Sequence, residues 1–270
     1  MTKIIQISDP HIVTKGELAY GQVDTSTALK KCVDKIKRIL PEIGPIDMII
    51  VTGDLTDFGK KEEYSLFREI VEEVGIPYRA IPGNHDNKLA MHKAFADKDW
   101  MPINGPINWE LDFYDLKIIA LDTSITGMAH GNLESISLDF LRTSLSTANG
   151  RPVLVATHHP PIITGLEKMD IQNLRDSAEL KEVLSAHTGE LKLICGHVHR
   201  NIVGQFGNKL CQIAPGVSHA VTMDLRTGAP NCLTKEPGSF LLHEIREGIL
   251  SHQILVDNYD GPFMFYPDSK

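Results

Sequence analysis

The sequence predicts an α/β fold built around a layered sheet. Short runs rich in isoleucine, valine and leucine, typical of buried strands, alternate with longer segments whose apolar residues recur at helical spacing. Five of the apolar runs end in a motif that contains histidine, aspartate or asparagine. Because open α/β sheets place their ligands at the carboxyl ends of the strands, these polar side chains are expected to share one edge.

The first part of the chain alternates strand and helix. Pro10 ends the first apolar run, because proline cannot donate a hydrogen bond to a strand ladder. In the segment that follows, Leu29, Val33 and Ile36 recur at the spacing of one helix face. The expected elements are a strand at 3–8, a helix at 25–40, a strand at 47–51, a helix at 61–74 and a strand at 78–81.

The second part continues the pattern and adds hairpins. Gly207-Asn208 is a turn signal between two strands. The stretch 216–238, which contains several Pro and Gly residues, indicates an excursion from the core. The expected elements are a hairpin at 106–122, a helix at 135–146, a strand at 153–156, a helix at 178–186, a strand at 191–195, a hairpin of 201–206 and 209–214, and two last strands at 239–244 and 250–256.

The composition is that of an ordinary soluble globular protein, with 270 residues of which 42% are apolar and 23% charged. No apolar run approaches the roughly 20 residues that span a bilayer, so no membrane contact is expected. The chain enters a strand pattern at once, which argues against a signal peptide. The four cysteines are widely spaced, without a C-x-x-C pair. These features predict a cytoplasmic protein with reduced thiols.

The charge balance restricts the partners. The net charge is −8, from 27 basic and 35 acidic residues, and no cluster of Lys and Arg forms a basic face. Proteins that bind a nucleic-acid duplex usually carry such a face, so no duplex partner is expected. An anionic substrate would have to be held by something local, such as metal ions.

The motifs at the strand ends have the composition of a metal site. On an extended chain, residues two apart point to the same side, so the side chains of Asp9 and His11 would converge, as would His197 and His199. A single His-x-His pair is more often a pair of surface histidines. The recurrence of such residues at five strand ends favours a metal centre, and mixed nitrogen and oxygen donors suit Fe, Mn, Zn or Co.

The remaining motif residues divide by position. Asn84 offers a neutral oxygen, and His85 beside it offers a nitrogen or a proton. Asp86 is expected to orient or cap rather than to bind a metal. Adjacent residues on an extended strand face opposite ways, so at most one of His158 and His159 should bind the same centre directly.

In their order and spacing, these motifs resemble the calcineurin-like metallophosphoesterases. The match covers about residues 3–215, and it implies a four-layer α/β/β/α sandwich. Two further segments are similar to the bacterial class III branch of cyclic nucleotide phosphodiesterases and glycerophosphodiesterases, namely Asp54-Leu55-Thr56-Asp57 and His158-His159-Pro160-Pro161. The motifs that carry the family resemblance are Asp9-x-His11, Gly53-Asp54, Gly83-Asn84-His85-Asp86, His158 and Gly196-His197-x-His199.

The resemblance implies a site with two divalent metal ions and assigns its ligands. Asp54 would bridge the two ions, and His85 would stabilise the pentacovalent phosphorus or protonate the leaving group. The implied activity is hydrolysis of a small phosphodiester to a monoester and an alcohol by a metal-bound hydroxide, with cyclic nucleotides, phosphomonoesters or an inactive scaffold as alternatives. The implied ligands are Asp9, His11 and His199 for one metal, and Asn84, His158 and His197 for the other.

Further expectations concern the substrate wall and the assembly. His219 and Tyr20 are similar in placement to substrate-contacting residues of the glycerophosphodiesterase branch, where His85 and Asn84 also face the substrate. His159 could support a ligand or form part of the pocket wall. The excursion resembles a segment that builds a dimer contact, which predicts a homo-oligomer. The expected division is a catalytic core at 1–200, a cap and dimerisation segment at 201–256 that partly continues the core sheet, and a tail at 257–270 that packs back on the core.

Overall fold

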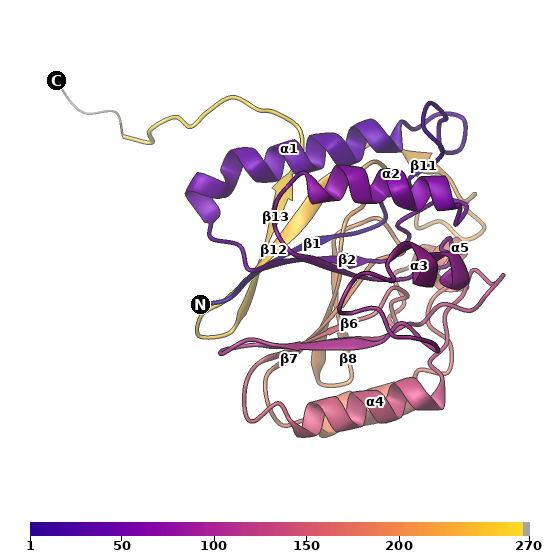
Figure 1. Cartoon of the computed structure of the whole chain (residues 1–270), viewed down its shortest axis with the longest axis vertical. Helices are drawn as coiled ribbons and strands as arrows, with labels where there is room; N and C mark the ends of the chain where they lie inside the picture. The colour runs from indigo at the N-terminus through magenta and orange to yellow at the C-terminus, as the bar shows by residue number, and fades with distance from the viewer. Residues whose placement is uncertain (267–270) are drawn as a thin grey trace.

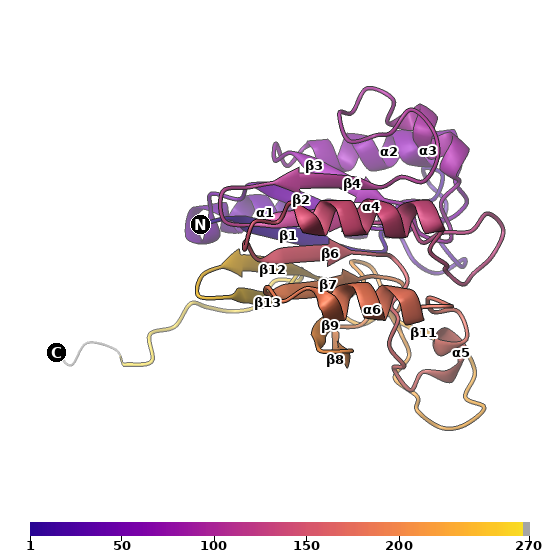
Figure 2. The same cartoon turned by 90° about the horizontal axis from the view of Figure 1, so that it is seen from below.

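The structure, a computed structural model, describes residues 1–266 as two facing β-sheets covered by helices. Helices α1 (Thr25–Ile43) and α2 (Lys61–Glu72) lie on one side, and α4 (Ser135–Ser146) and α6 (Ala178–Ala186) lie on the other (Figures 1 and 2). The layers therefore follow the order helix, sheet, sheet, helix. This confirms the expected four-layer α/β/β/α sandwich.

The first sheet has five strands in the order β13-β12-β1-β2-β3. Strands β1, β2 and β3 run parallel, so the loops after them begin at the same edge of the sheet. These loops carry Asp9, Asp54 and Asn84. The bounds are β1 Lys3–Ile7, β2 Met48–Thr52, β3 Tyr78–Ile81, β12 Ser239–Ile245 and β13 Ile249–Leu255.

The second sheet has six strands in the order β4-β5-β6-β7-β9-β8. Strands β5, β6, β7 and β9 run parallel, and the loops after β6 and β7 carry the histidine motifs that begin at His158 and His197. The metal-site motifs therefore come from both sheets. The bounds are β4 Trp109–Asp112, β5 Lys117–Ala120, β6 Val153–Ala156, β7 Leu191–Cys195, β8 Ile202–Phe206 and β9 Lys209–Ile213.

Strands from beyond residue 200 complete both sheets: β8 and β9 join the second, and β12 and β13 join the first. Between them, the excursion at 216–238 contains a short ribbon of β10 (Ala220–Val221) and β11 (Leu233–Thr234). Strands of two residues leave no alternation in the sequence, so this ribbon was not predicted. The structure also contains two short helices, α3 (Lys88–Ala94) and α5 (Glu167–Asp170). Helix α1 continues past Pro41 to Ile43, beyond its expected end at residue 40.

The C-terminal tail differs from the expectation that it packs back on the core. From residue 257 it leaves the body of the molecule (Figures 1 and 2). The Lys35 ammonium lies 4.5 Å from the ring centroid of Tyr259, but Phe263 and Phe265 are 80% and 97% exposed. The packing expected for 260–266 is therefore absent from the structure of a single chain. The predicted packing of 267–270 falls outside the described residues.

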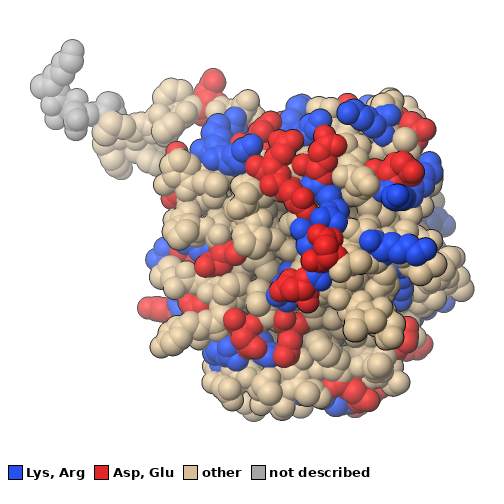
Figure 3. Space-filling view, in the orientation of Figure 1, with Lys and Arg blue, Asp and Glu red and all other residues tan. Residues whose placement is uncertain are grey.

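The surface and the helices bear on the expected partners. On the face shown in Figure 3, acidic and basic side chains are intermixed rather than gathered into a basic band. Among residues 1–266, no helix is both long and apolar enough to cross a membrane. The expected absence of duplex and membrane partners stays a prediction.

Candidate metal centre

The loops that carry the site have an unusual backbone. Asp9, His11, Asp54, His197 and His199 have φ angles of 55°, 46°, 50°, 74° and 55°, in the left-handed region that non-glycine residues rarely adopt. Such strain persists only where the surrounding structure over-determines it, and it is concentrated at functional sites. The extended backbone assumed from the sequence is therefore wrong here.

The left-handed turn separates the two histidines that follow β7. Val198 N donates to Gly196 O at 2.9 Å, so the chain folds tightly between His197 and His199. As a result their side chains join different groups of potential ligands, one with His158 and one with Asp9. The division that the family resemblance implied arises from this turn rather than from a strand.

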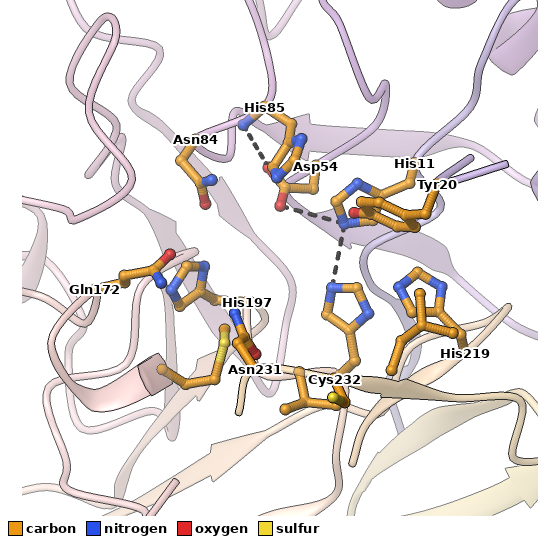
Figure 4. A pocket seen from close by; sticks show the side chains of 14 residues that line it. His11, Tyr20, Asp54, Asn84, His85, Gln172, His197, His219, Asn231 and Cys232 are labelled. Carbon is orange, nitrogen blue, oxygen red and sulfur yellow. Dashed lines mark hydrogen bonds and ion pairs between the residues drawn. The ribbon is translucent and has the colours of Figure 1, made fainter. Parts of the chain in front are cut away.

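The first group lies among four buried residues, Asp9, His11, Asp54 and His199, whose candidate ligand atoms are all within 4.8 Å of one another. His11 Nε2 is 3.1 Å from His199 Nε2 and 3.4 Å from Asp54 Oδ2. His199 Nε2 lies 3.4 Å from Asp9 Oδ1. Figure 4 shows Asp54 and His11 directed toward each other. The geometry describes one centre of nitrogen and carboxylate donors.

The second group adjoins the first through Asp54. His158 Nε2 lies 3.2 Å from Asn84 Oδ1 and 3.4 Å from Asp54 Oδ2, and the ring centroids of His158 and His197 are 5.1 Å apart. Asp54 Oδ2 is therefore 3.4 Å from a histidine nitrogen of each group. A single carboxylate stands between two sets of donors.

The protonation pattern fits metal ions at these groups. His11 Nδ1 faces Asp57 Oδ1 at 3.0 Å and His158 Nδ1 faces Thr52 O at 2.8 Å, so each Nδ1 is placed to donate a hydrogen and each Nε2 to present a lone pair. Lone pairs that face a carboxylate need positive charge between them. Burial lowers the pKa of His158, but the Asp54 carboxylate outweighs burial and raises that pKa to about 9. The raised pKa shows that the carboxylate favours a positive charge at this nitrogen.

Two further imidazoles are prepared as neutral donors. Burial and the neighbouring His158 lower the pKa of His197 to about 3, and burial with the neighbouring His11 places that of His199 well below its ordinary value. Buried His197 Nε2 has no hydrogen-bond partner among the described residues. Neutral, unpartnered imidazole nitrogens are the form that binds a metal ion. The donor set therefore fits divalent transition metals.

Asp57 is a functional residue that the sequence interpretation missed. Its Oδ1 lies 3.0 Å from His11 Nδ1 and 3.2 Å from His85 Nδ1, and its carbonyl oxygen is 3.0 Å from the same nitrogen of His85. Asp57 thus orients both His11, a potential metal ligand, and His85. The sequence singles out Asp57 only within the Asp54-Leu55-Thr56-Asp57 segment of the family resemblance, because a position three residues after Asp54 does not indicate a contact.

His85 is held as a cation at the edge of the site. Burial lowers its pKa, but the charges of Asp54 and Asp57 outweigh that effect and raise the pKa to about 10. Asp86 next to it binds no site group: its carboxylate accepts from Gly83 N at 2.9 Å and Leu55 N at 3.1 Å. It joins the two loops, as the orienting role predicted, whereas the cap of α3 is Asn87.

A cavity of about 250 Å³ opens onto this centre. Tyr20 and His219 lie in its wall, with ring centroids 5.5 Å apart, and the His219 ring is 4.5 Å from that of His199 (Figure 4). His159 does not line it: this residue is fully buried, and its Nδ1 lies 2.8 Å from Thr123 Oγ1. The His159 ring lies 4.8 Å from those of both His158 and His197, and the three residues form one group of potential ligands, whereas the strand alternation predicted that at most one of the adjacent histidines would approach the centre. The substrate contact expected of His159 stays a prediction.

Comparison with known proteins now identifies the family. The model of the calcineurin-like phosphoesterases matches residues 2–201. The chain belongs to the calcineurin-like phosphoesterase family. It is 38% identical over 266 residues to a probable glycerophosphodiester phosphodiesterase, GpdQ, of Arcobacter nitrofigilis, covering 97% of this chain and 96% of the relative. It is 31% identical over 224 residues to the 3',5'-cyclic adenosine monophosphate phosphodiesterase CpdA of Pseudomonas aeruginosa, covering 80% and 79%.

Solved structures show the same fold. A dimetal phosphatase from Danio rerio superposes with a TM-score of 0.64 at 12% identity, covering 95% of this chain and 99% of the phosphatase. At this identity the likeness concerns the fold alone. It agrees with the four layers seen in Figure 1.

The outer wall of the cavity in this calcineurin-like phosphoesterase is neutral. Of the described residues that line it, none is a lysine or an arginine. Met169 on α5 and Gln172, which follows that helix, lie in this wall. Besides His219, which the sequence analysis singled out, the excursion contributes Val221, Asn231, Cys232 and Leu233. These four had no sequence signal, because loop carboxamides and cysteines carry no periodicity.

Gly196 marks the point where the loops meet, and replacing it by alanine is expected to destabilise the protein by about 1–3 kcal/mol. A Cβ at this position would lie 2.2 Å from Ser8 Oγ, 2.7 Å from Thr52 O and 2.9 Å from Asp9 Oδ2. Urea unfolding of the metal-free variant measures the loss. Gly204→Ala is the control, because its Cβ would meet a side-chain methyl, Ile162 Cδ1, at 2.9 Å. Equal stability of the two variants would contradict this account.

Proposed function

We propose that this calcineurin-like phosphoesterase is a dinuclear metal-dependent phosphodiesterase that hydrolyses small diesters of the glycerophosphodiester type. The observation that carries the proposal is the position of Asp54 Oδ2, 3.4 Å from both His11 Nε2 and His158 Nε2. One ion would be held by Asp9, His11 and His199 and the other by Asn84, His158 and His197, with Asp54 shared.

When bound, two divalent ions supply the positive charge that holds the phosphate oxygens and lowers the pKa of a water molecule. This offsets the repulsion between an anionic diester and a protein of net charge −8. Nitrogen and oxygen donors together suit Fe, Mn, Zn or Co.

His85 supplies the acid of the proposed reaction. Asp57 accepts a hydrogen bond from its Nδ1 and thereby fixes the ring, while the charges of Asp54 and Asp57 keep the imidazole protonated. Because the His85 side chain lines the cavity, its Nε2–H can bind a phosphoryl oxygen or protonate the departing alcohol. Tyr20 and His219 are proposed to contact the substrate from the opposite wall (Figure 4).

The cavity supports a small substrate with a neutral alcohol group. Its volume of about 250 Å³ limits the leaving group, and its wall offers the carboxamides of Gln172 and Asn231 and, apart from His85 at the metal centre, no basic side chain that is held as a cation. A phosphomonoester carries a second charge that this wall does not balance. A 3',5'-cyclic nucleotide is the second candidate substrate, which the similarity to CpdA favours. An inactive scaffold is disfavoured because all seven expected metal positions and His85 are present.

We also propose a cytoplasmic location and a homo-oligomer. The first is supported by four free cysteines, of which three are buried. The second is supported by large apolar side chains exposed on the excursion, where Met223 and Leu225 are 52% and 62% exposed. Size-exclusion chromatography with light scattering measures the assembly directly.

A substrate panel tests the proposed function. With Mn²⁺ or Co²⁺ added, kcat/KM is expected to be highest for glycerophosphodiesters, lower for cyclic nucleotides and lowest for monoesters. Chelation should abolish activity, and Mn²⁺ should restore it, because the donors need ions to bind the phosphate. Less than one metal equivalent in the purified protein, together with no hydrolysis of bis(p-nitrophenyl) phosphate after Mn²⁺ or Co²⁺ addition, would overturn the proposal.

A further inference from the structure

A continuous chain of hydrogen bonds connects the two sheets and reaches the residues that precede the metal centre. None of its members lines the cavity. Apolar packing between sheets is non-directional, so a row of directional bonds across this interface has a specific effect on how the sheets are aligned. In order, the chain contains Lys192, Ser251, His243, Gln6, Thr52 and Ser8.

Gln6 is the centre of this chain and connects the two sheets. Its Nε2 donates to Thr52 Oγ1 at 2.9 Å in the first sheet and to Cys195 O at 3.0 Å in the second. Its Oε1 accepts from His243 Nε2 at 3.0 Å. With both Nε2 hydrogens and the carbonyl oxygen engaged, the fully buried amide has a single orientation.

His243 determines the direction of the bonds. It is fully buried, and burial with the nearby charge of Lys192 lowers its pKa to about 3, so its ring is neutral with one N–H. That hydrogen is on Nε2, which faces the Gln6 oxygen, and Nδ1 therefore accepts from Ser251 Oγ at 2.6 Å. The Lys192 ammonium donates to the same hydroxyl oxygen. Every bond thus donates in the same direction, from an ammonium toward the metal centre.

The other end of the chain acts on one residue of the metal centre. Thr52 Oγ1 donates to Ser8 Oγ at 2.8 Å, and Ser8 Oγ donates to Thr52 O at 3.5 Å. Thr52 O accepts from His158 Nδ1 at 2.8 Å, which turns His158 Nε2 toward Asp54. Ser8 Oγ, Thr52 O and Asp9 Oδ2 all converge on the bare Cα of Gly196.

We propose that Gln6 and His243 are positioning residues of the metal centre, which hold His158 in the orientation that metal binding requires. The inference rests on the proposed function, since it assigns a task to residues that touch neither substrate nor ion. A carboxamide does not pass on protons as a hydroxyl or imidazole does, so the chain orients groups rather than conducting protons.

The test measures Mn²⁺ affinity rather than turnover. Gln6→Met keeps the volume of the side chain but removes its three hydrogen bonds. Titration calorimetry of the metal-free protein with Mn²⁺ is expected to show a dissociation constant about 10–100-fold higher than in the unaltered protein, the usual effect of losing a partner behind a metal ligand. The KM of a diester at saturating Mn²⁺ should change less than about twofold, because the cavity wall is untouched.

A stability-matched control separates orientation from folding. Lys117 is also a buried lysine on a strand of the second sheet, paired with Glu110 at 3.0 Å, but it takes no part in the chain. Lys117→Met should lower the thermal midpoint and leave the Mn²⁺ dissociation constant unchanged. His243→Gln, which keeps an N–H directed at Gln6, should retain much of the affinity that His243→Met loses, and this pair decides the matter should Gln6→Met not fold.

The outcomes are distinct. Unchanged Mn²⁺ affinity in Gln6→Met, or an equal loss in Lys117→Met, overturns the inference and leaves the proposed phosphodiesterase intact. Equal affinities of His243→Gln and His243→Met overturn it as well. If the unaltered protein binds no Mn²⁺, the proposed function itself fails, and the positioning role fails with it.

Discussion

Replacing Asp54 by alanine is expected to lower kcat for a diester by at least about 10⁴-fold, the scale seen when an essential charged group is removed from an active site. Asp54 Oδ2 lies 3.4 Å from a histidine nitrogen of each donor group, and Asp54 Oδ1 accepts from His85 N at 2.9 Å. The variant therefore loses the shared carboxylate and leaves two sets of neutral imidazoles without their main counter-charge. Metal analysis should find fewer than two equivalents bound.

Two comparisons sharpen this result. Asp54→Asn preserves the size of the side chain and the acceptor for His85 N but removes the charge, so it should lose metal almost as fully as alanine. Asp34→Ala, at an exposed position on α1, should bind metal and turn over like the unaltered protein. Full turnover with two bound equivalents in Asp54→Ala would refute the bridging role.

Substituting His85 by alanine should lower kcat about 10²–10⁴-fold, the range for loss of a positioned proton donor. The residue lines the cavity, and Asp54 and Asp57 hold it as a cation that can donate to a phosphoryl or leaving-group oxygen. Its side chain groups with those of His11 and Asp57 rather than with Asp9, Asp54 and His199, and its Nδ1 is already engaged by the carbonyl oxygen of Asp57 at 3.0 Å. Bound metal should therefore stay nearly unchanged, as measured by elemental analysis.

The control for this prediction lies nearby in sequence. His92 is on α3, and its ring nitrogens lie 3.1 Å from the carbonyl oxygens of Pro102 and Gly105, away from the cavity. His92→Ala should leave kcat within about twofold, since surface changes away from a site have small effects. A loss of metal in His85→Ala as large as the loss of kcat would show that the residue is a ligand instead.

Much of the fold could be predicted because its strands are continuous apolar runs. The segments ending at Ser8, Thr52 and Cys195 are bounded by motifs whose residue types fit only a few chemistries, and neighbouring parallel strands place those motifs at one edge. The family resemblance supplied the pairing of the two sheets. Local pattern alone does not encode which sheet a strand joins.

The details of the site depended on information that spacing does not carry. The sequence suggested an extended chain at His197 and His199, whereas left-handed φ angles of 74° and 55° send the two rings to different groups. Asp57 could not be singled out, because its two contacts with His11 and His85 come from loops that meet only in the folded chain. The outer wall of the cavity could not be predicted either, because its residues also come from loops that meet only in the folded chain.

The origin of the donors in two sheets ties the amount of folded protein to the metal supply. Asp9, Asp54 and Asn84 follow strands of one sheet, and His158 and His199 follow strands of the other. Ions bound among these residues would hold the two sheets together. At a free metal concentration 100 times its dissociation constant, each such ion adds about 2.7 kcal/mol to the stability of the folded chain. A low metal supply would then reduce the amount of folded protein as well as its activity.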